Sequence, residues 1–221
     1  MKPFSWSYSK LKNFRTCPRR HKEIDLDKRF KDKENEVLTW GNSVHAALAN
    51  RLGKGLPLPK GMETFEPLIN RLEQAPGTKF IVEQKLAINK DFKPVGFFAE
   101  DAWFRAVVDV LILNPPVALM VDYKAGKILD DPQQMALSSQ CVFSHYPEIQ
   151  AIRTEYWWLA HDTITRTDFR RDQMAPIWRA VWPRIQELEQ AYNTNNYPPI
   201  PGGLCRNYCP VVTCEFHGKG G

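Results

Sequence analysis

Two short apolar runs on either side of a proline turn constrain the fold more than any other feature. The runs span residues 106–113, interrupted by Asp109, and 117–121, and the turn spans 114–116. Their brevity and their Val, Ile and Leu content predict two buried strands joined as a hairpin. A hairpin centred in this turn pairs residues whose numbers sum to 231. That register places Asp109 opposite Asp122.

Two carboxylates in this position require compensation. Directly opposed residues on adjacent strands have Cβ atoms roughly 5 Å apart, and like charges there repel. On an apolar sheet the pair needs a cation, which a divalent metal with oxygen ligands would supply. Because side chains alternate along a strand, Lys124 shares a face with Asp122 while Tyr123 points away. The pattern predicts a metal, two carboxylates and an ammonium on one face; the alternative is a structural ion pair at a strand end.

The chain contains a second Asp-x-Lys sequence, Asp91-Phe92-Lys93. An average composition produces this pattern by chance about once in a chain of this length. The second copy has no long apolar run before it, and Pro94 follows it directly. We therefore expect a loop there, with no role in chemistry.

Composition predicts one globular domain over residues 1–221, with 43% hydrophobic and 25% charged residues. No run of 18 apolar residues predicts a membrane span, and the first six residues lack the apolar stretch of a signal peptide. We expect a cytoplasmic setting, where cysteines bind metals more often than they form disulfides.

The net charge of +5 is unevenly distributed. Residues 1–33 contain eleven Lys or Arg and four Asp or Glu, a balance of +7, and the rest of the chain has a balance of −2. Four of these cations, Arg15, Arg19, Arg20 and Lys22, would suit a phosphate backbone. The alternative, favoured in the absence of other evidence, is a solvated helix face.

The order of elements predicts an α/β fold with a central mixed sheet flanked by helices. Helices are expected at 9–17, 36–52, around 65–72, from 133 towards 145, and at 176–193, with a kink at Pro183 in the last. Strands are expected at 79–88, 103–113, 117–124 and 152–159.

His45 lies on the 36–52 helix, one turn after Gly41. Glycine in a helix interior costs roughly 1 kcal/mol relative to alanine, so its missing side chain must serve a purpose. It could allow another backbone to pack closely, or it could leave room for a ligand in front of His45. A lone helix histidine is itself more often structural than a ligand. On the later helix, Gln134 could hold a phosphate oxygen or could simply be a good helix former.

Three cysteines within ten residues, Cys205, Cys209 and Cys214, stand out near the C-terminus. With His217 they could form a local zinc site. Alternatively, Cys17 could complete an iron–sulfur site from the other end of the chain. A loop of reduced cysteines remains the third reading. Cys141 is expected to be an inert buried thiol.

Taken together, these elements resemble the RecB-like branch of the PD-(D/E)xK nuclease superfamily. Five segments, in the family's order, carry the likeness over most of the chain. They are Ser7-Tyr8-Ser9-Lys10-Leu11 leading to Cys17-Pro18, Gly41-Asn42-Ser43-Val44-His45, Asp109 after its apolar run, Val121-Asp122-Tyr123-Lys124-Ala125-Gly126, and Gln134-Met135-Ala136-Leu137-Ser138. In the last segment Ser138 stands where the family has tyrosine. The resemblance implies a restriction-endonuclease-like core.

It also implies roles for individual residues. His45, Asp109, Asp122 and the backbone carbonyl of Tyr123 would bind Mg²⁺ or Mn²⁺. Asp109 and Asp122 would be catalytic together with Lys124, which would orient the attacking water and stabilise the transition state. The side chain of Gln134 would help to hold the substrate backbone.

The cysteines are similar to those of members that hold a 4Fe–4S cluster, such as the AddB nuclease domain and the CRISPR-associated adaptation nucleases. The short layout is similar to phage-encoded exonucleases. Cys17, Cys205, Cys209 and Cys214 would bind the cluster and join the N-terminal helix to the segment from about 197 to 221. Three and four residues separate the last three cysteines, whereas those relatives show two and then a longer gap. Zinc at Cys205, Cys209, Cys214 and His217 therefore stays open.

The expected function is a metal-dependent DNA exonuclease acting on free ends or single strands in recombination, repair or phage DNA processing. The expected partners are DNA and a recombination or CRISPR-type protein, with no membrane. The expected location is the cytoplasm of a bacterial or phage-infected cell. The alternatives are a non-catalytic nucleic-acid-binding module with a Cys-rich metal site, and a DNA endonuclease on the same fold.

Overall fold

The computed structural model describes residues 3–32, 36–77, 79–129 and 131–219, apart from the side chains of residues 37 and 38. The chain divides into two compact units. One is the segment Asn35–Ile177, and the other combines Met1–Glu34 with Trp178–Gly221. The expectation that a single nuclease domain spans the whole chain stays a prediction.

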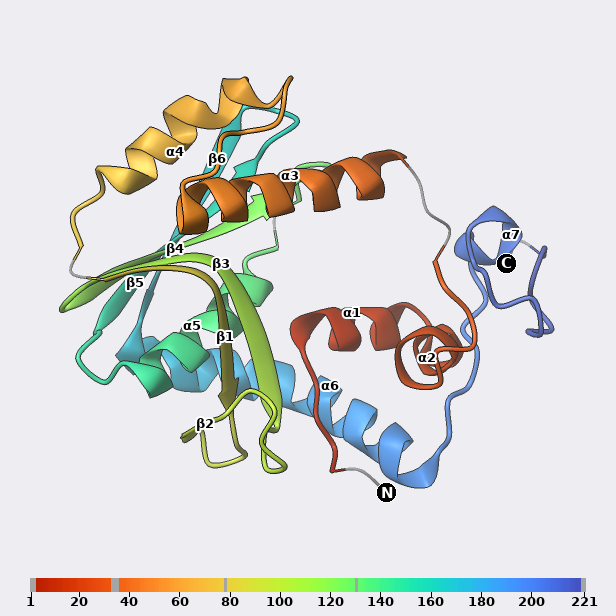
Figure 1. Ribbon diagram of the computed structural model, residues 1–221. Helices are drawn as coiled ribbons and strands as arrows, with labels where there is room; N and C mark the ends of the chain where they lie inside the picture. Colours follow the sequence, from red (N-terminus) through yellow and green to blue (C-terminus); the bar gives the residue numbers. More distant parts are fainter. Residues whose placement is uncertain (1–2, 33–35, 78, 130, 220–221) are drawn as a thin grey trace. The chain divides into compact units, whose positions relative to one another are not determined.

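Unit Asn35–Ile177 is built around a mixed sheet (Figure 1). In the described residues the sheet has six strands in the order β2-β1-β3-β4-β5-β6. The β4 and β5 strands run parallel, and all other neighbours are antiparallel. This confirms the predicted fold class. The strands are β1 (Lys79–Ile88), β2 (Pro94–Val95), β3 (Phe104–Asn114), β4 (Val117–Lys124), β5 (Ala151–Trp158) and β6 (Thr163–Arg170).

The β3–β4 hairpin has the predicted register. Its pairs run from Asn114 opposite Val117 to Val110 opposite Val121, so each pair of numbers sums to 231. Regular pairing stops there, one residue before the two aspartates. Because the apolar residues of both strands are buried, a shift by one residue would expose them, and this fixes the register.

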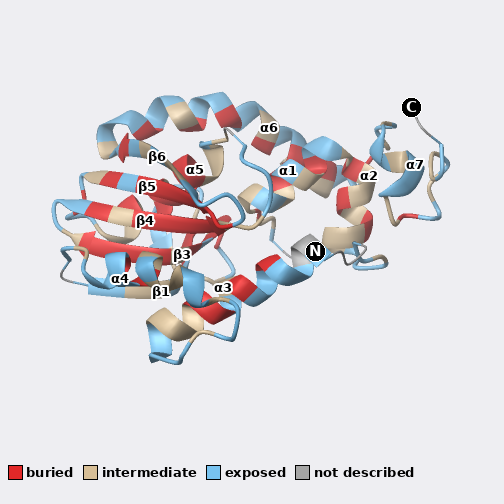
Figure 2. Ribbon diagram, turned by 90° about the horizontal axis from the view of Figure 1, so that it is seen from above, coloured by how far each residue is buried: buried red, intermediate tan, exposed pale blue. Residues whose placement is uncertain are grey.

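Helices cover both faces of the sheet (Figure 1). One face carries α3 (Glu36–Lys54) and α4 (Glu66–Glu73), and the opposite face carries α5 (Gln133–His145). Figure 2 shows that burial is concentrated on the central strands and on the inner faces of the helices. The core beneath α3 and α4 consists of Val44, Leu48, Ile69, Leu72, Val110, Ile112, Val121, Tyr123, Trp157 and Leu159.

Gly41 lets α3 approach the segment that follows β4. A Cβ built on Gly41 would lie 2.9 Å from the Cβ of Ala125, which is closer than real Cβ atoms come. Of the two readings of this glycine, the structure supports close packing of another backbone. The same close approach brings His45, one turn further along α3, beside the end of β4.

Strand β6 was missed in the sequence. Its residues are mostly polar, and only Phe169 among them is buried. It pairs on one side with β5 and is the last strand in the sheet order. An edge strand with one buried side chain has little of the apolar alternation that marks a strand. The Asp91-Phe92-Lys93 copy lies in a turn between β1 and β2, as predicted.

The other unit joins the two ends of the chain. It contains α1 (Tyr8–Thr16), α2 (Pro18–His21), a π-helix (Lys22–Leu26), α7 (Leu204–Asn207) and most of α6 (Met174–Thr194), which continues through Pro183. Ser7 caps α1 by accepting a hydrogen bond from the Lys10 amide. Trp6 and Trp178 pack edge to face, with ring centroids 6.0 Å apart. In the described part of the chain, no helix is long and apolar enough to cross a membrane.

Candidate functional site

Asp109 and Asp122 lie where the regular pairing of β3 and β4 ends. Asp109 Oδ2 accepts a hydrogen bond of 2.8 Å from the backbone N–H of Tyr123. Asp122 is buried, with 7% of its surface exposed. The carboxylate of Asp109 thus accepts the bond from the Tyr123 amide at the point where the two strands separate. This bond holds Asp109 beside Asp122.

The acid pair is electrostatically strained. Burial, followed by the charge of Asp122, raises the pKa of Asp109 to about 7. The nearby charge of Lys124 lowers this pKa but does not offset burial and the second carboxylate. On the facing helix, burial lowers the pKa of His45 below its ordinary value. His45 is therefore mainly neutral at pH 7, which is the form that binds metals.

Lys124 and Gln134 complete the cluster. Lys124 Nζ lies 2.5 Å from Asp122 Oδ2 and donates to Gln134 Oε1 at 3.0 Å. Gln134 Nε2 donates to Asp122 Oδ1 at 2.6 Å. The ammonium also lies 5.1 Å from the centre of the Tyr156 ring. As the alternation along β4 predicts, Lys124 and Asp122 share a face, and the amide of Gln134 links them.

His45 reaches the same place from α3. Its Nδ1 lies 3.6 Å from Asp109 Oδ2, and its ring packs edge to face on that of Tyr123, at 5.6 Å between centroids. The backbone of Tyr123 acts to raise the pKa of the imidazole, against the larger effect of burial. The structure therefore gathers His45, Asp109, Asp122 and the Tyr123 carbonyl, the four groups that the family resemblance assigned to a metal.

Glu83 is a further residue beside the site, and the motifs of the sequence did not single it out. The register of β1 on β3 places it opposite Asp109, and regular pairing is interrupted there. Its φ is +50°, a conformation uncommon for residues other than glycine and concentrated at functional sites. Its charge raises the pKa values of both His45 and Asp109. The signal in the sequence was an acid inside the 79–88 strand, paired with the acid-bearing strand.

The donor groups suit a hard divalent cation. Asp122 Oδ2 is buried and accepts no hydrogen bond of normal geometry, although Lys124 lies beside it. Two carboxylates, a carbonyl oxygen and a neutral imidazole are ligands that Mg²⁺ and Mn²⁺ accept. The fit is one of chemistry: within the described residues, no three His, Cys, Asp or Glu side chains form a ready-made ligand set.

Four of the cysteines lie in the other unit, and all four are free thiols: Cys17, Cys205, Cys209 and Cys214. Cys17 Sγ accepts a hydrogen bond of 3.4 Å from the Ile200 amide, which ties α1 to the C-terminal segment. Burial raises the pKa of Cys209, with smaller contributions from Cys205 and Cys17. These three thiols are thus close enough to interact, but they are not arranged as ligands in the part of the chain that is described.

Internal ion pairs occupy much of the basic N-terminal segment. Arg19 pairs with the buried Glu23 at 3.2 Å, and Arg29 approaches the same carboxylate at 2.9 Å. Arg20 pairs with Asp32, and Lys22 with Asp27 at 3.7 Å. Such pairing favours the alternative of a solvated helix face over a phosphate-binding patch, because these cations stabilise their own segment. Of the four cations Arg15, Arg19, Arg20 and Lys22, Arg15 forms no ion pair with any described residue.

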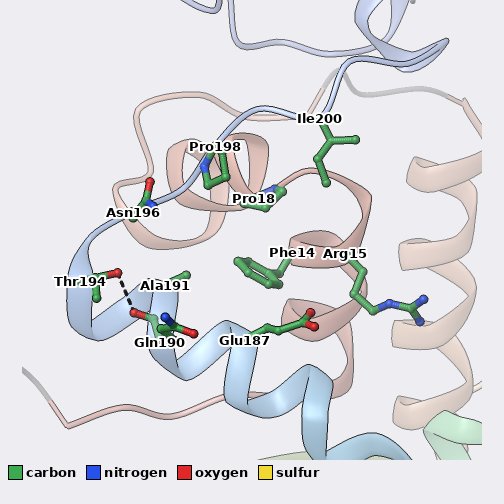
Figure 3. Close-up of a pocket in the computed structure, with 10 residues that line it drawn as sticks. All are labelled: Phe14, Arg15, Pro18, Glu187, Gln190, Ala191, Thr194, Asn196, Pro198 and Ile200. Carbon is green, nitrogen blue, oxygen red and sulfur yellow. Dashed lines mark hydrogen bonds between the residues drawn. The ribbon is translucent and has the colours of Figure 1, made fainter.

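Two cavities lie away from the acid cluster. One, of about 370 Å³, is in the unit of the chain ends (Figure 3). The ring of Phe14 is among the groups that line it, and Arg15 extends away from that ring. The other, of about 720 Å³, lies at the far end of the sheet, beside Val117 and Leu119. Neither is lined by His45, Asp109, Asp122, Lys124 or Gln134.

Comparison with known proteins agrees with this geometry. A profile of the PD-(D/E)XK nuclease superfamily matches residues 5–214. The chain therefore belongs to the PD-(D/E)XK nuclease superfamily. Its fold matches that of this superfamily, and membership implies a nuclease with a nucleic acid substrate.

Solved structures resemble the chain in fold. The crystal structure of a "Putative exonuclease" from Eubacterium rectale is similar, with 14% identity, a TM-score of 0.55 and coverage of 96% of this chain and 86% of that one. The structure of SSO0001 is similar at 15% identity and a TM-score of 0.50, covering 98% and 89% of the two chains. No curated protein matches. Membership of the RecB-like branch and kinship with iron–sulfur members stay predictions.

Proposed function

We propose that the protein is a metal-dependent DNA exonuclease of the RecB-like branch, hydrolysing phosphodiester bonds at free ends or in single strands. The observation that carries this proposal is the cluster of Asp109, Asp122, Lys124 and Gln134 at the separating ends of β3 and β4. A protein that only binds nucleic acid needs no buried acid pair with an attendant lysine. The cluster therefore favours catalysis.

His45, Asp109, Asp122 and the Tyr123 carbonyl would hold Mg²⁺ or Mn²⁺. Such an ion lowers the pKa of water and neutralises charge on the scissile phosphate. It would also offset the repulsion that raises the pKa of Asp109. Hydrolysis adds water across one P–O bond and leaves a terminal phosphate and a free hydroxyl group.

Lys124 is the group on this chain suited to the developing charge. Its ammonium is held by Asp122 and by Gln134 Oε1, so little reorganisation is needed before it can donate to a phosphate oxygen. As a compact point charge it would orient the attacking water and stabilise the transition state.

The family resemblance implies that Gln134 helps to hold the substrate backbone. Both polar atoms of its amide are engaged in the cluster, with Lys124 and with Asp122. We propose that it contacts the substrate phosphate by exchanging one of these bonds, and that until then it keeps the lysine and the acid in place.

We also propose that Cys17, Cys205, Cys209 and Cys214 bind one 4Fe–4S cluster with a structural role. In support, all four belong to the unit that contains both chain ends, and Cys17 Sγ accepts a hydrogen bond from the Ile200 amide. Zinc bound by Cys205, Cys209, Cys214 and His217 is the competing proposal. The partners we propose are DNA and a recombination or CRISPR-type protein, in the cytoplasm of a bacterial or phage-infected cell.

The test is digestion of end-labelled single- and double-stranded DNA, and of RNA, with Mg²⁺ or Mn²⁺ and with EDTA. We expect cation-dependent shortening from the ends of DNA. Asp122→Asn should abolish it, whereas Asp91→Asn, in the second Asp-x-Lys copy, should leave it unchanged. Undiminished cleavage by folded Asp122→Asn protein would refute the assignment, and cleavage of closed circular DNA would favour an endonuclease.

A further inference from the structure

The loop between β2 and β3 presents an exposed aromatic ring. Phe98 is 83% exposed, more than any other large apolar side chain among the described residues. Its neighbour Phe97 packs against it edge to face, with ring centroids 5.1 Å apart and planes at 86°. An apolar ring this open forgoes the free energy that burial would provide, and its flat face is available to a ligand.

The exposure does not result from a loose loop. The Ala99 amide donates to the Gly96 carbonyl at 3.0 Å, which closes a turn around the two rings. Arg105, on β3, donates from Nε to the Phe97 carbonyl at 2.6 Å and from Nη2 to the Ala99 carbonyl at 3.4 Å. The turn is thus fastened to the sheet, and the sheet holds Phe98 in its open position.

Cations accompany the rings. Lys85 Nζ lies 6.0 Å from the centre of the Phe97 ring and 5.9 Å from that of Phe98. The guanidinium of Arg105 lies 5.9 Å from the Phe97 ring. Lys85 is exposed and forms no ion pair with any described carboxylate, so its charge is available to an anion.

This group lies on a path to the acid cluster. Along β3, Phe104, Ala106 and Val108 are buried, while Arg105, Val107 and Asp109 alternate with them on a more open face. Lys85 is paired directly with Val107, which places it on that same face. At roughly 3.3 Å per residue, Val107 and Arg105 lie about 7 and 13 Å from Asp109. A stacked strand covers these distances in about two to four nucleotides, at roughly 3.4 Å each.

We propose that Phe98, with Lys85 beside it, is a stacking platform for one unpaired base of the DNA strand being cut. The base would lie on the open face of the Phe98 ring, and Lys85 would contact the adjoining phosphate. A base can stack on Phe98 only after it leaves its duplex partner. The platform therefore selects a single-stranded or frayed end and positions it a few nucleotides from Asp109. This inference rests on the proposed function and adds a substrate determinant to it.

The expected effect is large enough to measure. Base–aromatic stacking in single-strand binding proteins changes affinity by about 5- to 150-fold per base. Phe98→Ala should therefore weaken binding of a single-stranded 12-mer by at least about fivefold. Phe98→Trp should preserve binding, and Phe98→Leu, which is apolar without a stacking face, should not. Because the side chain is exposed, none of these variants should change the melting temperature noticeably.

The binding measurement uses full-length protein in EDTA, where the probe stays intact, and fluorescence anisotropy of a labelled single-stranded DNA 12-mer. A second series carries one abasic site at each position of the probe. Wild type should show one position where loss of the base weakens binding, and Phe98→Ala should be insensitive to that position. Val117→Ala, another exposed apolar residue at the far end of β4, serves as the control.

The outcomes separate the two proposals. If wild type cleaves DNA but Phe98→Ala binds within twofold of wild type, the platform is refuted and the nuclease assignment stands. If Phe98→Leu binds as well as wild type, the contact is apolar and the stacking proposal fails. If wild type cleaves no nucleic acid, the proposed function fails, while the abasic series still decides whether Phe98 holds a base.

Discussion

The acid–lysine cluster and the cysteine group are the two places where this chain concentrates reactive side chains, and they are built differently. In the first, Asp122, Lys124 and Gln134 are joined by contacts of 2.5–3.0 Å within the protein itself. In the second, Cys17 has a hydrogen bond from Ile200, but within the described residues the thiols form no ligand set.

The difference reflects how each group is brought together. A hairpin with a buried face aligns Asp109 with Asp122 through a two-residue turn, Pro115-Pro116, and the register leaves little freedom. Cys17 and Cys205 are 188 residues apart and meet only because both chain ends belong to one unit. We infer that the acids are positioned before any ion binds, whereas the thiols need an ion to order them.

The largest expected effect is the loss of cleavage when the acid–lysine cluster, and not the cysteine group, is altered. Lys124→Ala should lower cleavage by about 10²- to 10³-fold or more, the usual cost of removing a group that stabilises transition-state charge. Lys127→Ala is the matched control, since Lys127 is exposed just beyond the same strand. Initial rates on end-labelled DNA measure the effect. Equal rates for the two variants would show that the lysine only balances a structural charge.

Cys17→Ser should affect metal content and leave the hydrolytic site alone. Protein purified without oxygen should contain about four irons and four sulfides per chain, and the variant should contain none. Its melting temperature should fall by about 10 °C, as expected when a structural metal is lost. Cys141→Ala, at a buried thiol on α5, is the control for iron content.

The zinc alternative makes the opposite prediction. The protein would be colourless, with one zinc that survives Cys17→Ser and is lost in His217→Ala. Iron-free protein from an anaerobic preparation would refute the cluster.

His45→Ala should shift the metal requirement. Because His45 lies beside both Asp109 and Tyr123, its loss should raise the Mn²⁺ concentration for half-maximal cleavage by about 10- to 100-fold. His161→Ala, at an exposed histidine, should have no effect. A large fall in melting temperature with unchanged metal dependence would instead mark His45 as a structural residue.

Gly41→Ala tests the packing that brings His45 to the site. The added methyl group would lie 2.9 Å from Ala125 Cβ, and an alanine cannot swing aside. A strain of about 1–3 kcal/mol outweighs a gain in helix propensity of up to 1 kcal/mol. The melting temperature should fall by a few degrees, at about 2–4 °C per kcal/mol. Gly126→Ala, where an added Cβ would meet nothing within 4 Å, is the control.

The smallest effect concerns the charge of Asp109 in metal-free protein. A folded-state pKa of about 7, against an ordinary carboxyl pKa of 3.8, means that the folded protein holds the proton more tightly than the unfolded chain. This contribution to stability is complete below pH 3.8 and is lost as the pH rises through 7. Asp109→Asn should therefore raise the melting temperature by a few degrees at pH 8 and by less at pH 5. An equal rise in melting temperature at both pH values would contradict the raised pKa of Asp109.

Much of the fold could be predicted because its signals are local. Strands β1 and β4 and helix α5 have the expected bounds, and β3 and β5 are displaced by one residue. Their apolar runs are continuous, and Asn, Pro and Asp interrupt them clearly. The edge strand β6 could not be found in this way, because a strand with one buried residue derives its order from pairing with β5.

In the candidate site, too, the features with a local sequence signal could be predicted and those that depend on packing could not. The opposition of Asp109 and Asp122, and the shared face of Asp122 and Lys124, follow from a two-residue period and a symmetric turn. The link that Gln134 makes between them depends on where α5 packs, and the conformation of Glu83, with φ at +50°, depends on a break in the β1–β3 pairing. Neither has a local signal beyond the residue type.

By itself, then, the sequence determined the hairpin, its register and the chemistry of the acid pair, because short-range alternation and turn chemistry act between near neighbours. Only the tertiary structure decided that α3 brings His45 to Asp109, through the close approach that Gly41 allows. It also decided that Arg105 holds Phe98 open at the head of a strand leading to the acids. The first contact joins residues 64 positions apart, and the second joins a loop to the strand that follows it. Their energies come from packing, which no single segment encodes.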